Sequence, residues 1–305
     1  MPKVSVVIPT YNRPDLVKKA IGSILLQTYH DFEIIIVDDG MQKRAQSSVE
    51  EIHDSRIVYI QNEKSFGGGG ARNVGIKAAK GEYVAFLDDD DEWLPEKLEK
   101  QVRAFESCGP EVSVVFCGVS AFDVSGDLLY VNLPGEDGIV HPHDRLLRKC
   151  YIWTSAIMMR TLFREKEGLF DEELKKNQEW DLELRLSIMS DFYAINESLV
   201  RLNILDDDSH MGGKKNLSNI IAGYAFFLKK HDEEYRKHPS SLALRYFHVG
   251  ALYRDVGEMR KAGHMWLLAW RLEPKNLTYF SHFFFSLFGK KVYNKIRSLF
   301  GATEQ

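Results

Sequence analysis

The feature that most constrains the fold is a regular alternation of strand-like and helix-like segments through the first 107 residues. Apolar, β-branched runs predict buried strands, and the segments between them carry apolar residues at helical spacing. This order predicts an α/β fold with a mostly parallel, doubly wound sheet, connected in the right-handed sense. The predicted strands are 4–11, 32–39, 56–60 and 82–87, and the predicted helices are 14–28, 43–53, 71–79 and 95–107.

The alternation becomes irregular after about residue 110. Residues 112–122 and 127–133 predict a strand pair across a Ser-Gly turn, 152–160 is strand-like and 181–189 has helical spacing. A strand follows, and the chain is predicted to be helical from about residue 216.

The distribution of charge changes near the residue, about 216, at which the predicted helical part begins. Residues 1–209 hold 24 basic and 37 acidic side chains, whereas 210–305 hold 16 and 7. The switch falls within 206–215, so we predict a domain boundary there, with a first domain over 1–210 and a helical C-terminal region over 211–305. An acidic first part argues against a nucleic-acid partner. The three cysteines form no CxxC pair, which excludes a cysteine zinc site and favours reduced thiols in the cytoplasm.

Polar segments follow three of the predicted strands. They are 10–13, 38–40 and 88–91, and the glycine-rich GGGGARN at 67–73 lies between the last two. Ligands of open α/β sheets bind outside the carboxyl ends of the strands, so these segments predict one shared site.

Four successive aspartates, 88–91, repel each other without a counter-ion. Carboxylate oxygens suit Mg²⁺ or Mn²⁺, particularly when a substrate phosphate completes the shell. The alternative is an acidic flank at the start of the helix at Pro95, which the helix dipole would favour.

Other residues of this edge suit a nucleotide. Asp39 could accept a hydrogen bond from a nucleobase with Tyr11 stacking nearby, or Asp39 could simply form a turn. The glycines of 67–73 would let the backbone approach a ligand, with Arg72 pairing with a phosphate. The alternative is a flexible loop that caps the next helix, and the spacing of a Walker loop is absent.

Taken together, SVVIPTYNR, IIIVDDG, GGARNVGIKAAKGEYVAFLDDDDEW and GLFDEELKKNQEWDLELRL resemble family 2 glycosyltransferases of the GT-A fold, over roughly residues 3–205. The resemblance implies a nucleotide-sugar donor, most often a UDP-sugar, and Mn²⁺ or Mg²⁺ held by a DxD motif at Asp88 and Asp90, with Asp90 as the main ligand. It implies donor-binding roles for Pro9, Thr10, Tyr11, Arg13, Asp39, Gly68, Arg72, Asp88 and Asp89.

The family's catalytic base falls within 178–181. Glu179 stands in the usual place of an Asp, and Asp181 is the alternative, which could instead be a helix N-cap. A single base suits direct displacement with inversion at the sugar. Relatives often carry a His near the end of the domain, and His210 either takes that role or lies in an exposed loop.

The resulting prediction is an inverting, metal-dependent hexosyl- or N-acetylhexosaminyltransferase acting on a glycan or polyprenyl-linked acceptor in cell-surface polysaccharide synthesis. The alternatives are a non-catalytic carbohydrate- or protein-binding module on the same fold, and a nucleotidyltransferase. The sugar, linkage, choice of metal and oligomeric state stay open.

The C-terminal third carries two further patterns. Residues 243–276 match one tetratricopeptide-like repeat and predict a helix pair, which is a packing unit or a partner-docking surface. The tail, 277–300, is rich in Phe and basic residues but too short in its apolar part to span a bilayer. It is predicted to be either a buried helix or an interfacial one, which would bring a cytoplasmic protein to the inner face of the cell membrane.

Overall fold

The computed structural model describes residues 1–165, 169–174, 176–205 and 217–300. The chain forms two compact units. The first comprises 1–146, 150–173 and 178–207, and the second comprises 147–149, 174–177 and 208–305. His210 and the predicted boundary at 206–215 lie outside the described residues. Within the described part, no helix is both long enough and apolar enough to cross a membrane.

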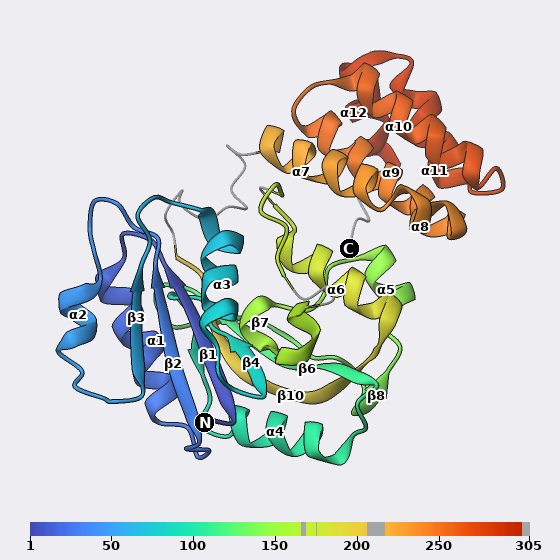
Figure 1. Cartoon of the computed structure of the whole chain (residues 1–305). Helices are drawn as coiled ribbons and strands as arrows, with labels where there is room; N and C mark the ends of the chain where they lie inside the picture. Colours follow the sequence, from blue (N-terminus) through green and yellow to red (C-terminus); the bar gives the residue numbers. More distant parts are fainter. Residues whose placement is uncertain (166–168, 175, 206–216, 301–305) are drawn as a thin grey trace. The chain divides into compact units, whose positions relative to one another are not determined.

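The first unit is built on a single sheet (Figure 1). Its strands are β1 (Val4–Thr10), β2 (Phe32–Asp38), β3 (Ile57–Gln61), β4 (Tyr83–Phe86), β5 (Glu92–Trp93), β6 (Val112–Phe122), β7 (Leu128–Asn132), β8 (Gly138–Val140), β9 (Ile157–Arg160) and β10 (Asp191–Asn203). The order is β3-β2-β1-β4-β9-β6-β10-β5, with β7 beside β6 and β8 beside β10.

One strand interrupts the parallel order of this sheet, because β9 runs antiparallel between β4 and β6. β3, β2, β1 and β4 are mutually parallel, as the alternation predicts, and β6 and β10 are parallel too. β5, β7, β8 and β9 pair antiparallel with their neighbours. The α/β class is confirmed, with a mixed second half. Parallel neighbours need long crossovers, whereas the antiparallel strands β6 and β7 are joined by a turn at 123–127.

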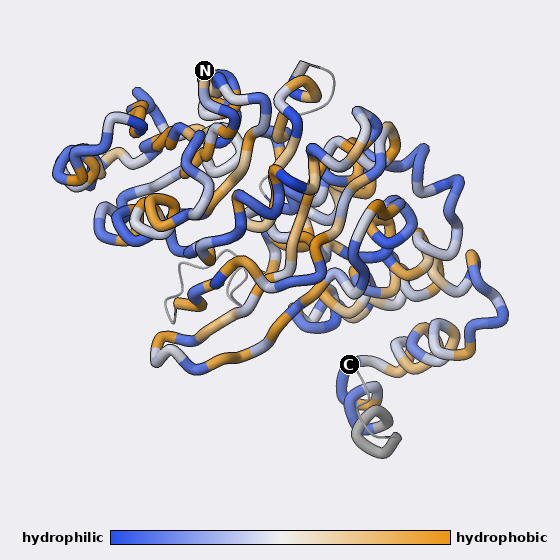
Figure 2. Tube along the Cα trace, turned by 90° about the horizontal axis from the view of Figure 1, so that it is seen from below, coloured by the Kyte–Doolittle hydropathy of each residue, from blue (hydrophilic) through white to orange (hydrophobic). Residues whose placement is uncertain are grey.

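Helices cover both faces of the parallel half. The helices around the sheet are α1 (Pro14–Leu25), α2 (Gln46–Glu50), α3 (Gly67–Ala78), α4 (Lys97–Ser107), α5 (His143–Arg148) and α6 (Gln178–Met189), with short 3₁₀ turns η1 (Thr154–Ala156) and η2 (Thr161–Glu165). Side chains of α1 and α4 pack with alternate residues of β1 and β2 in the main core. α3 packs on the other face, where Gly75 leaves room for Val7. Hydrophobic stretches, in orange, accordingly recur along the chain trace in Figure 2.

The second unit is helical from residue 217, as predicted from about residue 216. The helices of this part are α7 (Leu217–Lys230), α8 (Asp232–Lys237), α9 (Pro239–Asp255), α10 (Met259–Leu272), α11 (Leu277–Ser286) and α12 (Gly289–Phe300). α9 and α10 are the predicted repeat-like pair, joined through Gly257 at φ +86°. Gly250 of α9 leaves room for Trp266 of α10, because a Cβ there would lie 2.5 Å from the indole Nε1.

Candidate active site

The predicted polar segments meet at the carboxyl edge of the parallel strands. Thr10 pairs in register with Asp38 of β2, and β4 lies on the other side of β1. The Thr10 hydroxyl donates a hydrogen bond of 2.7 Å to Asp89 Oδ2, which ties the end of β1 to the segment after β4. Residues 79 positions apart in sequence are thus brought together by strand order alone.

Arg13 bridges two of the four aspartates. Its Nη1 lies 2.9 Å from Asp90 Oδ2 and 3.3 Å from Asp89 Oδ1. Arg13 precedes the first turn of α1, so the helix start fixes its position beside the aspartates. One guanidinium therefore faces two carboxylates.

Arg72 of α3 lies between the aspartate segment and α6. It forms a short ion pair with Asp88. Burial is the largest single effect and lowers the pKa of Arg72, but the attraction and hydrogen bond of Asp88, together with Glu179 and Asp89, raise that pKa overall. Arg72 thus interacts with both the predicted metal ligands and the predicted base.

Asp91 points inward rather than toward the open side. Ser155 of η1 donates a hydrogen bond of 2.6 Å to Asp91 Oδ2, and accepts one of 3.1 Å from the backbone N–H of Asp88. Asn203 of β10 donates a hydrogen bond of 2.8 Å to the backbone carbonyl of Asp90. These contacts fix the backbone of 88–91, and they give Asp91 a structural place.

The aspartate segment holds more negative charge than its two arginines balance. Burial raises the pKa of Asp89 to about 7, against the opposing effects of Arg13 and Thr10. Burial and repulsion from neighbouring aspartates raise the pKa of Asp90 and Asp91 as well. A divalent cation relieves such repulsion. The Asp88 and Asp90 side chains keep 33% and 17% of their surface exposed. The donor set, two accessible carboxylates two residues apart, therefore fits Mg²⁺ or Mn²⁺.

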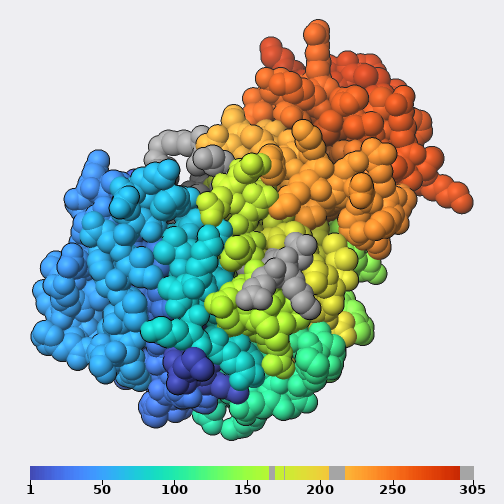
Figure 3. Space-filling model, viewed as in Figure 1, coloured from blue at the N-terminus to red at the C-terminus, as the bar shows by residue number. Residues whose placement is uncertain are grey.

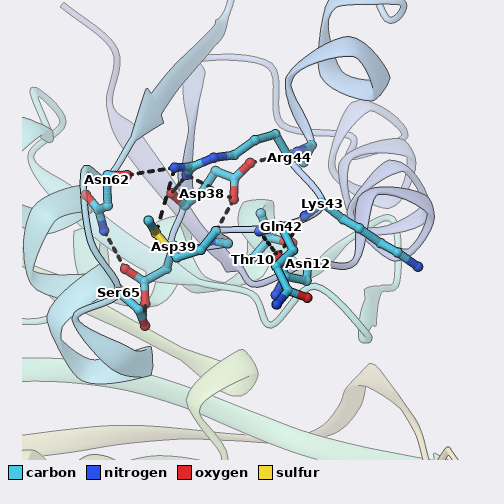
Figure 4. Close-up of polar contacts among 12 residues, drawn as sticks. Thr10, Asn12, Asp38, Asp39, Gln42, Lys43, Arg44, Asn62 and Ser65 are labelled. Carbon is cyan, nitrogen blue, oxygen red and sulfur yellow. Dashed lines mark hydrogen bonds and ion pairs between the residues drawn. The ribbon is translucent and has the colours of Figure 1, made fainter.

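Asp38 and Asp39 each organise one loop (Figure 4). Asp38 is buried and accepts hydrogen bonds from Gly40 N, Ala45 N and Tyr59 Oη. Asp39 accepts from Asn62 Nδ2 at 2.8 Å and Ser65 Oγ at 2.6 Å.

Asp39 also accepts from the backbone N–H groups of Phe66 and Gly67, at the start of α3. With these donors added to those of Asn62 and Ser65, each Asp39 oxygen has at least two donors, which uses its ordinary acceptor capacity. A direct contact between Asp39 and a nucleobase stays a prediction.

The remaining predicted donor residues lie around the end of β1. Tyr11 is 51% exposed just beyond the strand, while Pro9 lies within β1 opposite Val37. Asn12 adopts φ 57° and accepts hydrogen bonds from Gln42 N and Lys43 N. The backbone of Gln42 and Lys43 is therefore anchored by Asn12, next to Tyr11 in the chain.

The glycine run is part of a helix, which corrects the prediction of a loop before a helix at 71. α3 begins at Gly67, whose φ is +74°, and Gly68, Gly69 and Gly70 form its first turn. A Cβ at Gly69 would lie 2.5 Å from Gln178 Nε2, and one at Gly68 would lie 3.2 Å from Arg72 Nη1. At Gly69 the missing side chain admits α6, so protein packing accounts for that glycine.

α6 places the two candidate bases differently. It begins at Gln178, so the alternative of Asp181 as an N-cap is wrong. Asp181 is fully buried one turn into the helix, and Arg185 Nη2 lies 3.0 Å from its Oδ2. Arg185 also donates to the Leu169 carbonyl. Glu179 is partly exposed and interacts electrostatically with Arg72.

Several side chains that position the site were not singled out from the sequence. Asn62 follows β3 directly, so the strand-end rule could have found it. Ser155 and Asn203 carry no local signal, because tertiary packing brings them to the aspartates. Asn73 pairs with the backbone N–H and carbonyl of Phe170, which fixes the segment leading to α6.

The comparisons with known proteins identify the family to which this fold belongs. The model of glycosyl transferase family 2 matches residues 5–165, so the chain belongs to that family and is a glycosyltransferase.

Three curated relatives are similar over much of the chain. An uncharacterized glycosyltransferase of Rickettsia typhi is 31% identical over 75% of this chain and 72% of its own length. The putative colanic acid biosynthesis glycosyl transferase WcaA of Escherichia coli K12 is 29% identical over 77% and 83%. WfaP of Escherichia coli, a UDP-Glc:α-D-GlcNAc-diphosphoundecaprenol β-1,3-glucosyltransferase, is 33% identical over 52% and 61%.

Two solved structures share the fold. S. aureus TarS in complex with UDP-GlcNAc superposes with a TM-score of 0.62 at 18% identity, covering 96% of this chain and 92% of that one. The mannosyltransferase PcManGT of Pyrobaculum calidifontis, in complex with GDP-Man and Mn²⁺, superposes with a TM-score of 0.53 at 17% identity. The match covers 98% of this chain and 87% of that one. These likenesses confirm the GT-A type of architecture.

Proposed function

We propose that residues 1–210 form the catalytic domain of an inverting glycosyltransferase that uses a UDP-sugar and a divalent cation. The observation that carries this is the place of Arg72, which pairs with Asp88 and also interacts with Glu179. A donor diphosphate, its cation and a general base require this convergence. The choice of UDP is supported by TarS, which was solved with UDP-GlcNAc, and by WfaP, whose donor is UDP-Glc.

Asp90 and Asp88 would hold the cation, and Arg13 and Arg72 would then turn toward the donor diphosphate. The bound cation would supply Lewis-acid stabilisation of the charge that develops on the leaving diphosphate. Tyr11, exposed at the end of β1, offers a ring on which the base can stack. Asp39 orders the loop at 62–67 beside this subsite.

Glu179 is the general base in this proposal. It removes the proton of an acceptor hydroxyl, whose oxygen attacks the anomeric carbon as the bond to the diphosphate breaks. The products are the inverted glycoside and the nucleoside diphosphate. Asp181 is unsuited to this step because it is fully buried and paired with Arg185, whereas Glu179 is partly exposed.

The acceptor is proposed to be a lipid-linked sugar of a bacterial surface polysaccharide. WfaP acts on a GlcNAc-diphosphoundecaprenol, and WcaA is assigned to colanic acid synthesis. The transferred sugar is then a hexose or an N-acetylhexosamine.

The test measures UDP release from UDP-Glc and UDP-GlcNAc, with and without GlcNAc-diphosphoundecaprenol, in Mn²⁺. Glu179→Gln should lower turnover by about 10²–10⁴-fold and leave UDP affinity within about twofold. The proposal fails if Glu179→Gln turns over as fast as the wild type on a donor that the wild type uses.

A further inference from the structure

α11 is apolar on two opposite faces. One face packs inside the second unit, where Tyr279 is buried and Phe283 lies against the cluster of Trp266 and Tyr293. The other face carries large apolar side chains that stay exposed at helical spacing. These residues, which continue past the helix end, are Leu277, Phe280, Phe284, Leu287 and Phe288. A helix that is apolar all round is normally covered on every side.

The exposed side chains form a continuous strip, here called the aromatic ladder (277, 280, 284, 287 and 288). The ring centroids of Phe280 and Phe284 are 5.8 Å apart, and those of Phe284 and Phe288 are 5.3 Å apart. Trp270 of α10 extends the ladder, at 5.0 Å from Phe280. Contiguous apolar surface of this kind marks a contact with a protein or a membrane.

Charge favours one of these two partners. Residues 274–300 hold five Lys or Arg side chains and no Asp or Glu. Lys290 and Lys291 are exposed directly after Phe288, where the chain turns into α12 at Gly289 with φ +80°. Within the part of the chain that is described, neither lysine forms an ion pair. A second copy would bring the same cations against one another, whereas an anionic surface would attract them.

We propose that the aromatic ladder and Lys290 and Lys291 form a docking surface for an anionic lipid bilayer. α11 lies in the plane of the interface, with the Phe rings among the upper acyl chains and the lysines at the head groups. Ten residues of helix extend about 15 Å, which is half the thickness of a hydrocarbon core. The surface belongs to the second unit (orange to red in Figure 3) and is independent of the sugar chemistry.

The test uses the full chain and sedimentation with vesicles of phosphatidylcholine alone or with one-quarter phosphatidylglycerol. The wild type should bind the anionic vesicles, more weakly at higher salt, and bind the neutral ones poorly. Phe284→Glu should weaken binding at least tenfold, and Phe284→Leu should preserve it. Lys291→Glu should weaken binding about fivefold or more. Lys229→Glu, the same charge change on exposed α7, is the matched control and should alter affinity less than twofold.

Trp270 offers a second readout. Trp270 lies beside Phe280, so lipids brominated near the head group should quench the fluorescence of Trp270 when the ladder enters the bilayer. Phe284→Glu should abolish this quenching. Phe284 is exposed, so this variant should keep the wild-type thermal midpoint. The proposal is overturned if the wild type ignores anionic vesicles or if Phe284→Glu binds them equally well. It is also overturned if light scattering shows that Phe284→Glu instead dissociates a dimer that does not bind vesicles.

Discussion

The two units use charge in opposite ways. In the first unit, acidic side chains are drawn inside and held by specific partners, as Asp89 is by Thr10 and Arg13. In the second, cations such as Lys290 and Lys291 stay exposed beside exposed rings. Buried, partnered charge is fixed in position, which suits chemistry on one small ligand. Exposed charge beside apolar surface suits an extended, deformable partner such as a lipid bilayer. The difference teaches that burial, more than net charge, separates a reaction site from a docking surface.

The largest expected effect on stability comes from removing a buried, paired charge in the first unit. Asp181→Asn breaks the ion pair between the fully buried Asp181 and the mostly buried Arg185, and should lower the free energy of unfolding by about 3–5 kcal/mol. Glu179→Gln, two residues earlier and partly exposed, should change it by about 0.5 kcal/mol or less. Urea unfolding of both variants measures this contrast. If the two lose equal stability, Asp181 is not the structural partner described here.

A smaller effect is expected in the second unit. A Cβ at Gly250 would lie 2.5 Å from Trp266 Nε1, so Gly250→Ala should destabilise the helix pair by about 1–3 kcal/mol. Gly22→Ala in α1 is the matched control, because no atom lies within 4 Å of a Cβ there. It should be neutral or stabilising by up to about 1 kcal/mol. The affinity for UDP should be unchanged in both variants. A weaker affinity in Gly250→Ala would mean that the second unit affects nucleotide binding by the first.

A more gradual effect, spread over several pH units, concerns one buried carboxyl in the first unit. Neither oxygen of Glu183 has a hydrogen-bond partner among the described residues. Burial, followed by repulsion from Glu179, raises the pKa of Glu183 well above its usual range. The folded state therefore binds this proton more tightly than the unfolded chain. Stability is fully present below about pH 4.5 and falls as pH rises toward the raised pKa, by up to about 1.4 kcal/mol per pH unit.

Glu183→Gln should remove that dependence and make the protein more stable at neutral pH. Thermal unfolding between pH 5 and 8 measures the slope for both proteins. An unchanged slope in the variant would show that Glu183 is already ionised in the folded state.

Much of the first unit follows from local sequence. Strands such as 4–10 and 32–38 are continuous apolar runs, and their polar ends meet because parallel strands share an edge. The site residues Thr10, Arg13, Arg72 and Asp88 to Asp90 come together for that reason.

The features that the sequence did not predict depend on tertiary contacts. Gly67 to Gly70 are poor helix formers, and their turn forms because Asp39 holds its N–H groups and Gln178 packs on Gly69. Asp181 resembles a helix start locally, but Arg185 draws it into the core. Ser155 reaches Asp91 across 64 residues, and no periodic pattern records such a contact.

The central claim is that the aspartates after β4 hold a cation on which a uridine nucleotide binds. Calorimetric titration of the wild type with UDP, with and without Mn²⁺, tests it most directly, beside Asp90→Asn and the exposed control Asp31→Asn. Binding should require Mn²⁺, should weaken at least 100-fold in Asp90→Asn, and should be unchanged in Asp31→Asn. UDP binding that is equally tight without Mn²⁺, or in Asp90→Asn, would contradict the account.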